Sequence, residues 1–191
     1  MGAATGVTCY TCHRGQPIPP KVWFSSPQPE GGLLAAARTQ VHLPTPTAAH
    51  TVSPPDTLDA LLVGDHCVGV ASPEALPSGN DSHTQDARST YALMMVMSES
   101  LGVNCTFCHN TQSFQSWNGP TQRVTAWHGI QMSRDLNSAY MEPLTATFPD
   151  TRRGPTGDVA KVFCATCHQG QHKPLGGVAM ARDYIGLAPP A

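Results

Sequence analysis

The sequence predicts a mainly α-helical fold with much irregular structure, organised around a bound group rather than around a large core of side chains. Of its 191 residues, 18 are Pro and 17 are Gly, whereas aromatic residues make up only 6%. Such a chain has long irregular stretches and few large side chains with which to fill a core. The second observation is that six of its seven cysteines form three CxxC pairs, each followed at once by histidine.

These three CxxCH motifs indicate what the bound group is. They are Cys9/Cys12/His13, Cys105/Cys108/His109 and Cys164/Cys167/His168. In this motif two thiols attach covalently to a haem, and the adjacent histidine binds the iron as its proximal ligand. Zinc sites and redox-active disulfides are the alternatives, but neither requires a histidine directly after every second cysteine. We therefore expect three haem c groups, attached in an export compartment such as the periplasm. The remaining cysteine, Cys67, is expected to be a small buried apolar side chain.

Composition divides the chain into three regions. Residues 1–30 are predicted to end a first haem-binding repeat, 31–88 to form a Pro-rich connector, and 89–191 to form a second repeat that holds two haems. The prolines spread between residues 17 and 55 exclude helix over most of that stretch. Within the connector, the apolar run 61–70 predicts a small β-hairpin.

A methionine-rich helix is predicted from residue 89 to 101, with serine or threonine as its N-cap and Gly102 as its stop. Helical periodicity places Met94 and Met97 on one face and turns Met95 away. A methionine on that face can be the second axial ligand of the haem held by the motif that follows. Spacing alone leaves Met94 and Met97 as alternatives.

Two further helices are predicted in the second repeat. One runs from about residue 122 to 140 and ends before Pro143. Three of its apolar residues lie near helical spacing, namely Val124, Trp127 and Ile130. The other is a short helix over 157–163 that leads into the last motif. Helix, short turn and CxxCH thus occur twice in succession.

An internal repeat relates the first and third motifs. Both begin the frame CxTCHxGQxxP, at Cys9 and at Cys164, whereas the middle motif does not share it. The two motifs are therefore interpreted as equivalent positions in a pseudo-twofold duplication. Such a duplication predicts a fourth motif upstream of Cys9 as the counterpart of the one at Cys105. We expect that motif, a signal peptide and further distal-ligand segments to precede residue 1.

Charge and hydropathy exclude two classes of protein. The 11 Lys and Arg against 13 Asp and Glu give a formal net charge of −2, which argues against a nucleic-acid partner. No apolar run approaches the roughly 18–20 residues that cross a bilayer.

The first and third motifs have no comparable methionine-rich helix to supply a second iron ligand. Met132 and Met141 are available to the third motif but lie far back from it in the chain. The other histidines are expected to be solvated or packed rather than ligands; they are His42, His50, His66, His83, His128 and His172.

The residues around the motifs resemble a known family, the tetrahaem cytochrome subunit of purple-bacterial photosynthetic reaction centres. The similarity is carried by LMMVMSESLGVNCTFCHNTQSFQSW at 93–117, QRVTAWHGIQMSRDLN at 122–137 and CATCHQGQHKPL at 164–175. In addition, TGVTCYTCHRG at 5–15 is similar to the segment around that family's second haem. The connector carries little of the likeness, although its hairpin region sits where the family has one.

The resemblance implies roles for individual residues. Met94 corresponds to the distal ligand of the haem held by Cys105 and Cys108, and Arg123 to an arginine that raises the potential of that haem. The family's counterpart of the middle haem lies nearest the special pair of bacteriochlorophylls, and the last haem is ligated by two histidines. The remaining distal ligands come from a region before the first motif, and His128 matches no ligand position.

The resemblance also implies a function, which is electron transfer rather than catalysis. It implies a subunit peripheral to the periplasmic face of the photosynthetic membrane, docked on integral reaction-centre subunits that carry bacteriochlorophyll. That subunit re-reduces the photo-oxidised special pair with electrons from a small soluble cytochrome c or a high-potential iron–sulfur protein. A free-standing periplasmic multihaem shuttle is an alternative. A multihaem reductase is another, and it would need an open iron beside an acid–base cluster.

Overall fold

The computed structural model describes residues 7–25, 58, 61–62, 84–114 and 116–178, with the backbone alone for 84–89. Within these ranges the chain forms helices, irregular segments and isolated β-bridges but no strand, which agrees with the predicted mainly α class. None of the described helices is both long enough and apolar enough to span a bilayer. The helices are α2 (Cys9–His13), α4 (Thr84–Leu101), η3 (Cys105–Phe107), α5 (Gln122–Asp135), η4 (Leu136–Met141), η5 (Glu142–Ala146), η6 (Asp150–Arg152), α6 (Cys164–His168) and η7 (Pro174–Gly177).

Helix α4 is the predicted methionine-rich helix, but it begins at Thr84 rather than at residue 89 or 90. Its end at Leu101 was predicted correctly, because Gly102 takes the left-handed conformation (φ +65°) that stops a helix. The N–H of Val103 then bonds to the carbonyl of Ser98. The predicted face is also confirmed, since Met97 is buried while Met95 is 48% exposed.

Helix α5 covers most of the second predicted helix and continues into η4, a π-helical segment. Beyond it, the 3-10 helix η5 begins at Glu142 and has Pro143 in its first turn, so the long helix ends before the proline as predicted. Of the three apolar residues near helical spacing, Ile130 is buried, Trp127 packs against the core cluster and Val124 is 37% exposed. The buried stripe of α5 therefore passes through Ile130 and not through Val124.

The short helix predicted over 157–163 is wrong. This segment is extended, and Lys161 forms an antiparallel bridge with Trp23 through backbone hydrogen bonds of 3.1 and 2.8 Å. On the next residue, the amide of the buried Asn137 accepts a bond from the N–H of Val162 (2.7 Å) and donates one to its carbonyl (2.9 Å). These tertiary partners satisfy the backbone groups that a helix would have bonded internally.

The connector lies largely outside the described residues. The same holds for the predicted hairpin, of which only Leu61 and Leu62 are described, and Leu61 has 3-10 conformation. Leu61 is nonetheless fully buried, and its carbonyl accepts a hydrogen bond from Asn137 (3.3 Å). The connector thus contributes at least one side chain to the core of the second repeat.

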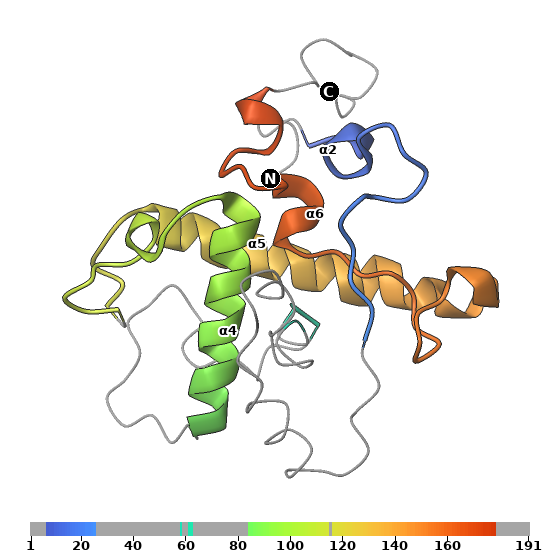
Figure 1. Ribbon diagram of the computed structural model, residues 1–191, viewed down its shortest axis with the longest axis horizontal. Coiled ribbons are helices and arrows are strands. Elements are labelled where there is room, and N and C mark those ends of the chain that lie inside the picture. The colour runs from blue at the N-terminus through green and yellow to red at the C-terminus, as the bar shows by residue number, and fades with distance from the viewer. Residues whose placement is uncertain (1–6, 26–57, 59–60, 63–83, 115, 179–191) are drawn as a thin grey trace, which may run out of the picture.

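The side-chain core is small and lies where α4 meets α5. Its buried members are Leu61, Leu93, Met97 and Ile130. Figure 1 shows α4 crossing in front of the long α5, with α2 and α6 next to each other above it. The bridge between residues 23 and 161 and the packing of α2 on α6 hold residues 7–25 against the last motif. The short segment before the connector is therefore part of the same body as the second repeat.

Candidate haem-binding sites

The first and third motifs fold as matching one-turn helices, α2 and α6. In each, a buried threonine inside the motif accepts a hydrogen bond from the backbone N–H just before the helix. Thr11 bonds to Thr8 N–H and Thr166 to Phe163 N–H, both at 3.0 Å. This explains the shared threonine of the repeated frame CxTCH. The residue after each histidine is in the left-handed conformation, which ends the turn.

All three motif histidines are oriented by a backbone carbonyl. The Nδ1 of His13 lies 3.0 Å from Gln16 O, that of His168 lies 2.9 Å from Gln171 O, and that of His109 lies 2.9 Å from Phe114 O. A carbonyl only accepts, so Nδ1 donates in each case and Nε2 keeps its lone pair. Histidines that bind a metal are held by this kind of outer hydrogen bond.

The middle motif differs from the other two. It has Phe107 where they have threonine, and its turn is the 3-10 helix η3. Its histidine, His109, bonds to a carbonyl five residues later in the chain, whereas the other two histidines bond to a carbonyl three residues later. The same carbonyl, Phe114 O, accepts a second bond from the guanidinium of Arg123 at 2.9 Å, and Ser116 O accepts another from that guanidinium. The structure thus places the Arg123 guanidinium beside His109, and its role in setting a haem potential stays a prediction of the family resemblance.

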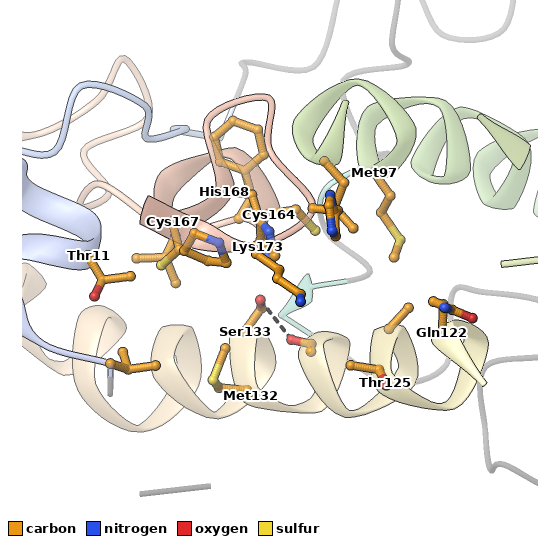
Figure 2. Close-up of a pocket in the computed structure, with 18 of the residues that line it drawn as sticks. Thr11, Met97, Gln122, Thr125, Met132, Ser133, Cys164, Cys167, His168 and Lys173 are labelled. Atoms are coloured by element: carbon orange, nitrogen blue, oxygen red, sulfur yellow. Dashed lines mark hydrogen bonds between the residues drawn. The ribbon is translucent and has the colours of Figure 1, made fainter. Parts of the chain in front are cut away.

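A cavity of about 480 Å³ lies between α5 and the third motif. Both cysteines and the histidine of that motif line it, as does Cys108 of the middle motif. Figure 2 shows Met132 of α5 on one side and His168, Cys164 and Cys167 on the other. The volume is in the usual range for bound cofactors, about 300–1,000 Å³.

The first and third motifs touch directly. Cys12 Sγ lies 2.7 Å from Cys167 Sγ, and Arg14 donates a hydrogen bond to Cys167 O at 3.1 Å. Since the third motif also shares its cavity with Cys108, the three attachment sites form a continuous series in the order first, third, second. This order differs from their order in the chain.

Burial favours the neutral form of the candidate iron ligands. It lowers the pKa of His109 and of His168, so both imidazoles are neutral at physiological pH. Burial also raises the pKa of Cys108, and raises that of Cys164 to about 11. Within the described ranges, no three His, Cys, Asp or Glu side chains converge as ligands of a bare metal ion.

The two methionines that spacing left open are placed differently. Met97 is buried and lines the cavity of the third motif, whereas Met94 is half-buried against the core cluster and is not among the cavity's lining residues. Sequence reasoning missed Trp117, whose ring stacks on Arg123 with 4.3 Å from Cζ to the ring centroid. It also missed the buried Lys161. The sequence offered one signal for each: Trp117 is an aromatic residue in a run without charged residues, and Lys161 is a lysine among apolar residues.

These sites fit haem c. Each has two free thiols beside a histidine whose tautomer leaves Nε2 available, and the third opens on a cavity of cofactor size. When bound, haem supplies one-electron transfer at a potential set by its second ligand, its burial and nearby charge.

Comparison with known proteins agrees with these sites. Residues 1–188 match the family described as photosynthetic reaction centre cytochrome C subunit. Reaction centre cytochrome c subunits from Rubrivivax gelatinosus and Thermochromatium tepidum are 50% and 43% identical to this chain, over 98% and 97% of its length. One from Roseobacter denitrificans is 37% identical over 97%. The chain spans about half the length of these relatives, 46–52%. Motifs, geometry and similarity agree, and the chain belongs to the family of photosynthetic reaction centre cytochrome c subunits.

Proposed function

We propose that this chain carries three haem c groups and passes electrons to a photosynthetic reaction centre. It takes them from a soluble carrier, either a small cytochrome c or a high-potential iron–sulfur protein, and re-reduces the photo-oxidised special pair. It does so at the periplasmic face of the membrane, docked on the integral subunits that hold bacteriochlorophyll. The observation that carries this proposal is the continuous series of three attachment sites, each with its histidine already oriented.

The two contacts in this series bring neighbouring attachment sites close together. The contact between Cys12 and Cys167 joins the first and third sites, and the cavity shared by Cys108 and Cys167 joins the third and second. A route through these contacts needs no intervening protein layer. Electrons entering at the first motif therefore reach the middle motif, which the family resemblance places nearest the special pair.

Met94 and Arg123 set the potential of the middle haem in this proposal. Met94 is the distal ligand, and a methionine ligand raises the potential relative to a second histidine. Arg123 shares Phe114 O with His109, so its cation withdraws electron density from the carbonyl that His109 donates to. A weaker acceptor leaves the imidazole less electron-rich, and both effects favour the reduced iron.

Flash photolysis tests the function. Photosynthetic membranes stripped of their own cytochrome subunit are supplied with the reduced, haem-loaded chain and excited by a single flash. We expect the chain to be oxidised in step with re-reduction of the special pair. A chain in which serine replaces Cys105 and Cys108 should lose this step, because it cannot hold the middle haem. Haems that stay reduced after the flash, or a middle haem that binds carbon monoxide, would contradict the proposal.

A matched pair of substitutions on α4 tests the ligand. Met94→Leu and Met97→Leu conserve volume and apolar character, so each should cost little stability. We expect Met94→Leu alone to remove one haem's sulfur-to-iron absorption band and to lower the potential of that haem. Near-infrared spectroscopy and redox titration of both variants measure this. Loss of the band in Met97→Leu, with Met94→Leu unchanged, would assign the ligand to Met97 instead.

A further inference from the structure

The cavity between α5 and the third motif is lined by apolar side chains from several elements and by one lysine. The apolar ones include Met97 of α4, Met132 of α5 and Phe163, which precedes α6. Among the described residues that line this cavity, Lys173 is the one lysine or arginine, and there is no Asp or Glu. The cavity therefore carries a positive charge that its described lining residues do not balance.

Lys173 is held in place through both its backbone and its side chain. The N–H of Gly176 donates a hydrogen bond to the carbonyl of Lys173 at 3.1 Å. The aliphatic stem packs on Gly177, since a Cβ added to that glycine would lie 3.2 Å from Lys173 Cδ. Figure 2 shows the Lys173 side chain extending into the cavity in the direction of α5. Its amine is thus directed at the space that a bound group would occupy.

The ammonium of Lys173 is a charged donor that remains available in this cavity. The hydroxyls of Ser133 and Thr125, which also line it, already donate to backbone carbonyls four residues earlier, at 3.0 and 3.4 Å. Within the described part of the chain, no carboxylate lies at ion-pairing distance from Lys173. An ammonium only donates hydrogen bonds, and an ionised carboxylate is the acceptor that bonds to it most strongly. The amine therefore suits a ligand that brings its own carboxylate.

The haem attached at Cys164 and Cys167 is such a ligand, because it is an apolar ring with two propionate carboxylates on one edge. The apolar walls suit the ring. An ionised carboxylate is costly to bury without a partner, so the propionates belong where water and a cation are both within reach. Lys173 meets this condition, since it lines the cavity and is also exposed to solvent.

We propose that Lys173 is a propionate-binding residue, whose ammonium pairs with a propionate of the haem attached at Cys164 and Cys167. The inference rests on the proposed haem at the third motif and adds an anchor for the edge of the ring that the two thiols do not hold. The ion pair fixes how the ring is turned relative to His168. The same positive charge favours the reduced form of this haem over its oxidised form.

Zero-length cross-linking of the haem-loaded wild-type chain tests the contact directly. A water-soluble carbodiimide activates a carboxylate, an amine in contact with it displaces the carbodiimide as its urea, and the amide that forms has lost one water. Trypsin then releases residues 162–182, because cleavage after Lys173 is blocked by Pro174. This peptide carries the third motif, contains no Asp or Glu, and has Lys173 as its only lysine. We expect the haem-bearing peptide 162–182 to lose the mass of one water.

Lys173→Met is the control for this reaction, and its haem-bearing peptide should keep its full mass. A wild-type peptide that carries haem but loses no water overturns the inference, and so does equal water loss in Lys173→Met. An amide that joins residues 162–182 to another peptide also overturns it, because Lys173 would then lie against a different carboxylate. Absence of haem from this peptide in the untreated wild-type chain would instead overturn the proposed function.

Redox titration of the haem-loaded variants measures the effect of the charge. The third haem is identified as the one that is lost when serine replaces Cys164 and Cys167. In Lys173→Met the ratio of reduced to oxidised third haem at a fixed applied potential should fall roughly fivefold, the upper range for a partly exposed charge interaction. Lys173→Arg keeps the cation and should restore the wild-type ratio.

Lys21→Met is the matched control, because it removes the same charge from an exposed lysine that does not line the cavity. It should leave the third haem unchanged. An equal fall in Lys21→Met and Lys173→Met would mean that only net charge matters, and this result contradicts the inference. A Lys173→Met chain with three haems and the wild-type ratio contradicts it as well.

Discussion

Gly102→Ala should push the third attachment turn away from the end of α4. An alanine Cβ at this position would lie 2.1 Å from Gly170 O, and that atom belongs to backbone rather than to a flexible side chain. Gly170 would have to retreat, breaking the bond from its N–H to Ser100 O (2.8 Å). The left-handed conformation of residue 102 adds strain of about 1–2 kcal/mol in any residue with a Cβ, and the lost bond adds about 1 kcal/mol.

We therefore expect Gly102→Ala to destabilise the chain by about 3 kcal/mol and to slow electron transfer between the second and third haems. Denaturant unfolding and flash kinetics measure the two effects. Gly157→Ala is the matched control, since Gly157 also has positive φ (+81°) but open space around its Cβ. Gly157→Ala should lose only the stability that backbone strain costs, and its electron-transfer kinetics should be normal. Equal effects in both variants would show that contact with Gly170 is unimportant.

Lys161→Met should destabilise the junction between the two ends of the described chain. The Lys161 side chain is 1% exposed, yet its ammonium pairs with Asp158 and lies 3.2 Å from Glu142. It also lies 5.1 Å from the centre of the Trp23 ring. Methionine keeps the apolar contacts but leaves a carboxylate that is only 13% exposed without its cation. Breaking a buried pair in this way costs about 3 kcal/mol.

The effect of Lys161→Met depends on pH through Asp158. Burial would raise the pKa of this carboxyl, but hydrogen bonds from Lys161, Ser25 N–H and Thr156 outweigh it and lower the pKa from 3.8 to about 2. A pKa depressed by folding stabilises the protein above pH 3.8, and this contribution is lost as the pH falls towards 2. The stability difference between wild type and Lys161→Met should therefore shrink over that window.

Denaturant unfolding at pH 7 and at pH 3 measures this difference. The control is Asp150→Asn, which removes the pair between Arg153 and a 96% exposed carboxylate. Exposed pairs of this kind contribute little, so we expect no measurable change at either pH. A Lys161→Met chain as stable as wild type at pH 7 would contradict the structural role of the buried pair.

The sequence predicted the parts of this structure that local chemistry determines. The motif residues, the stop at Gly102 and the burial of Met97 follow from spacing and from backbone preferences. The predicted helix over 157–163 failed because Trp23, over 130 residues earlier in the chain, pairs with Lys161. Propensity carries no information about such a partner.

The candidate sites also combine features that depend on local sequence with features that depend on distant parts of the chain. The motifs predict the attachment cysteines and the proximal histidines, and the family resemblance predicts a role for Arg123; these assignments stay predictions. The contact between Cys12 and Cys167 could not, because it depends on how α2 packs on α6. Nor could the stacking of Arg123 on Trp117 be recognised beforehand, because it depends on how the loop before α5 folds back on that helix.

The loop after the middle motif has a consequence for how the surroundings of a motif histidine can be varied. In the first and third motifs the histidine bonds to a carbonyl three residues on, within a closed turn. In the middle motif the carbonyl is five residues on, and Arg123 reaches it from α5. The longer loop thus leaves room for a cation at the carbonyl that orients the histidine, while the CxxCH motif itself is unchanged. Grafting residues 110–117 together with the arginine offers protein engineers a way to add positive charge next to such a histidine without altering its motif.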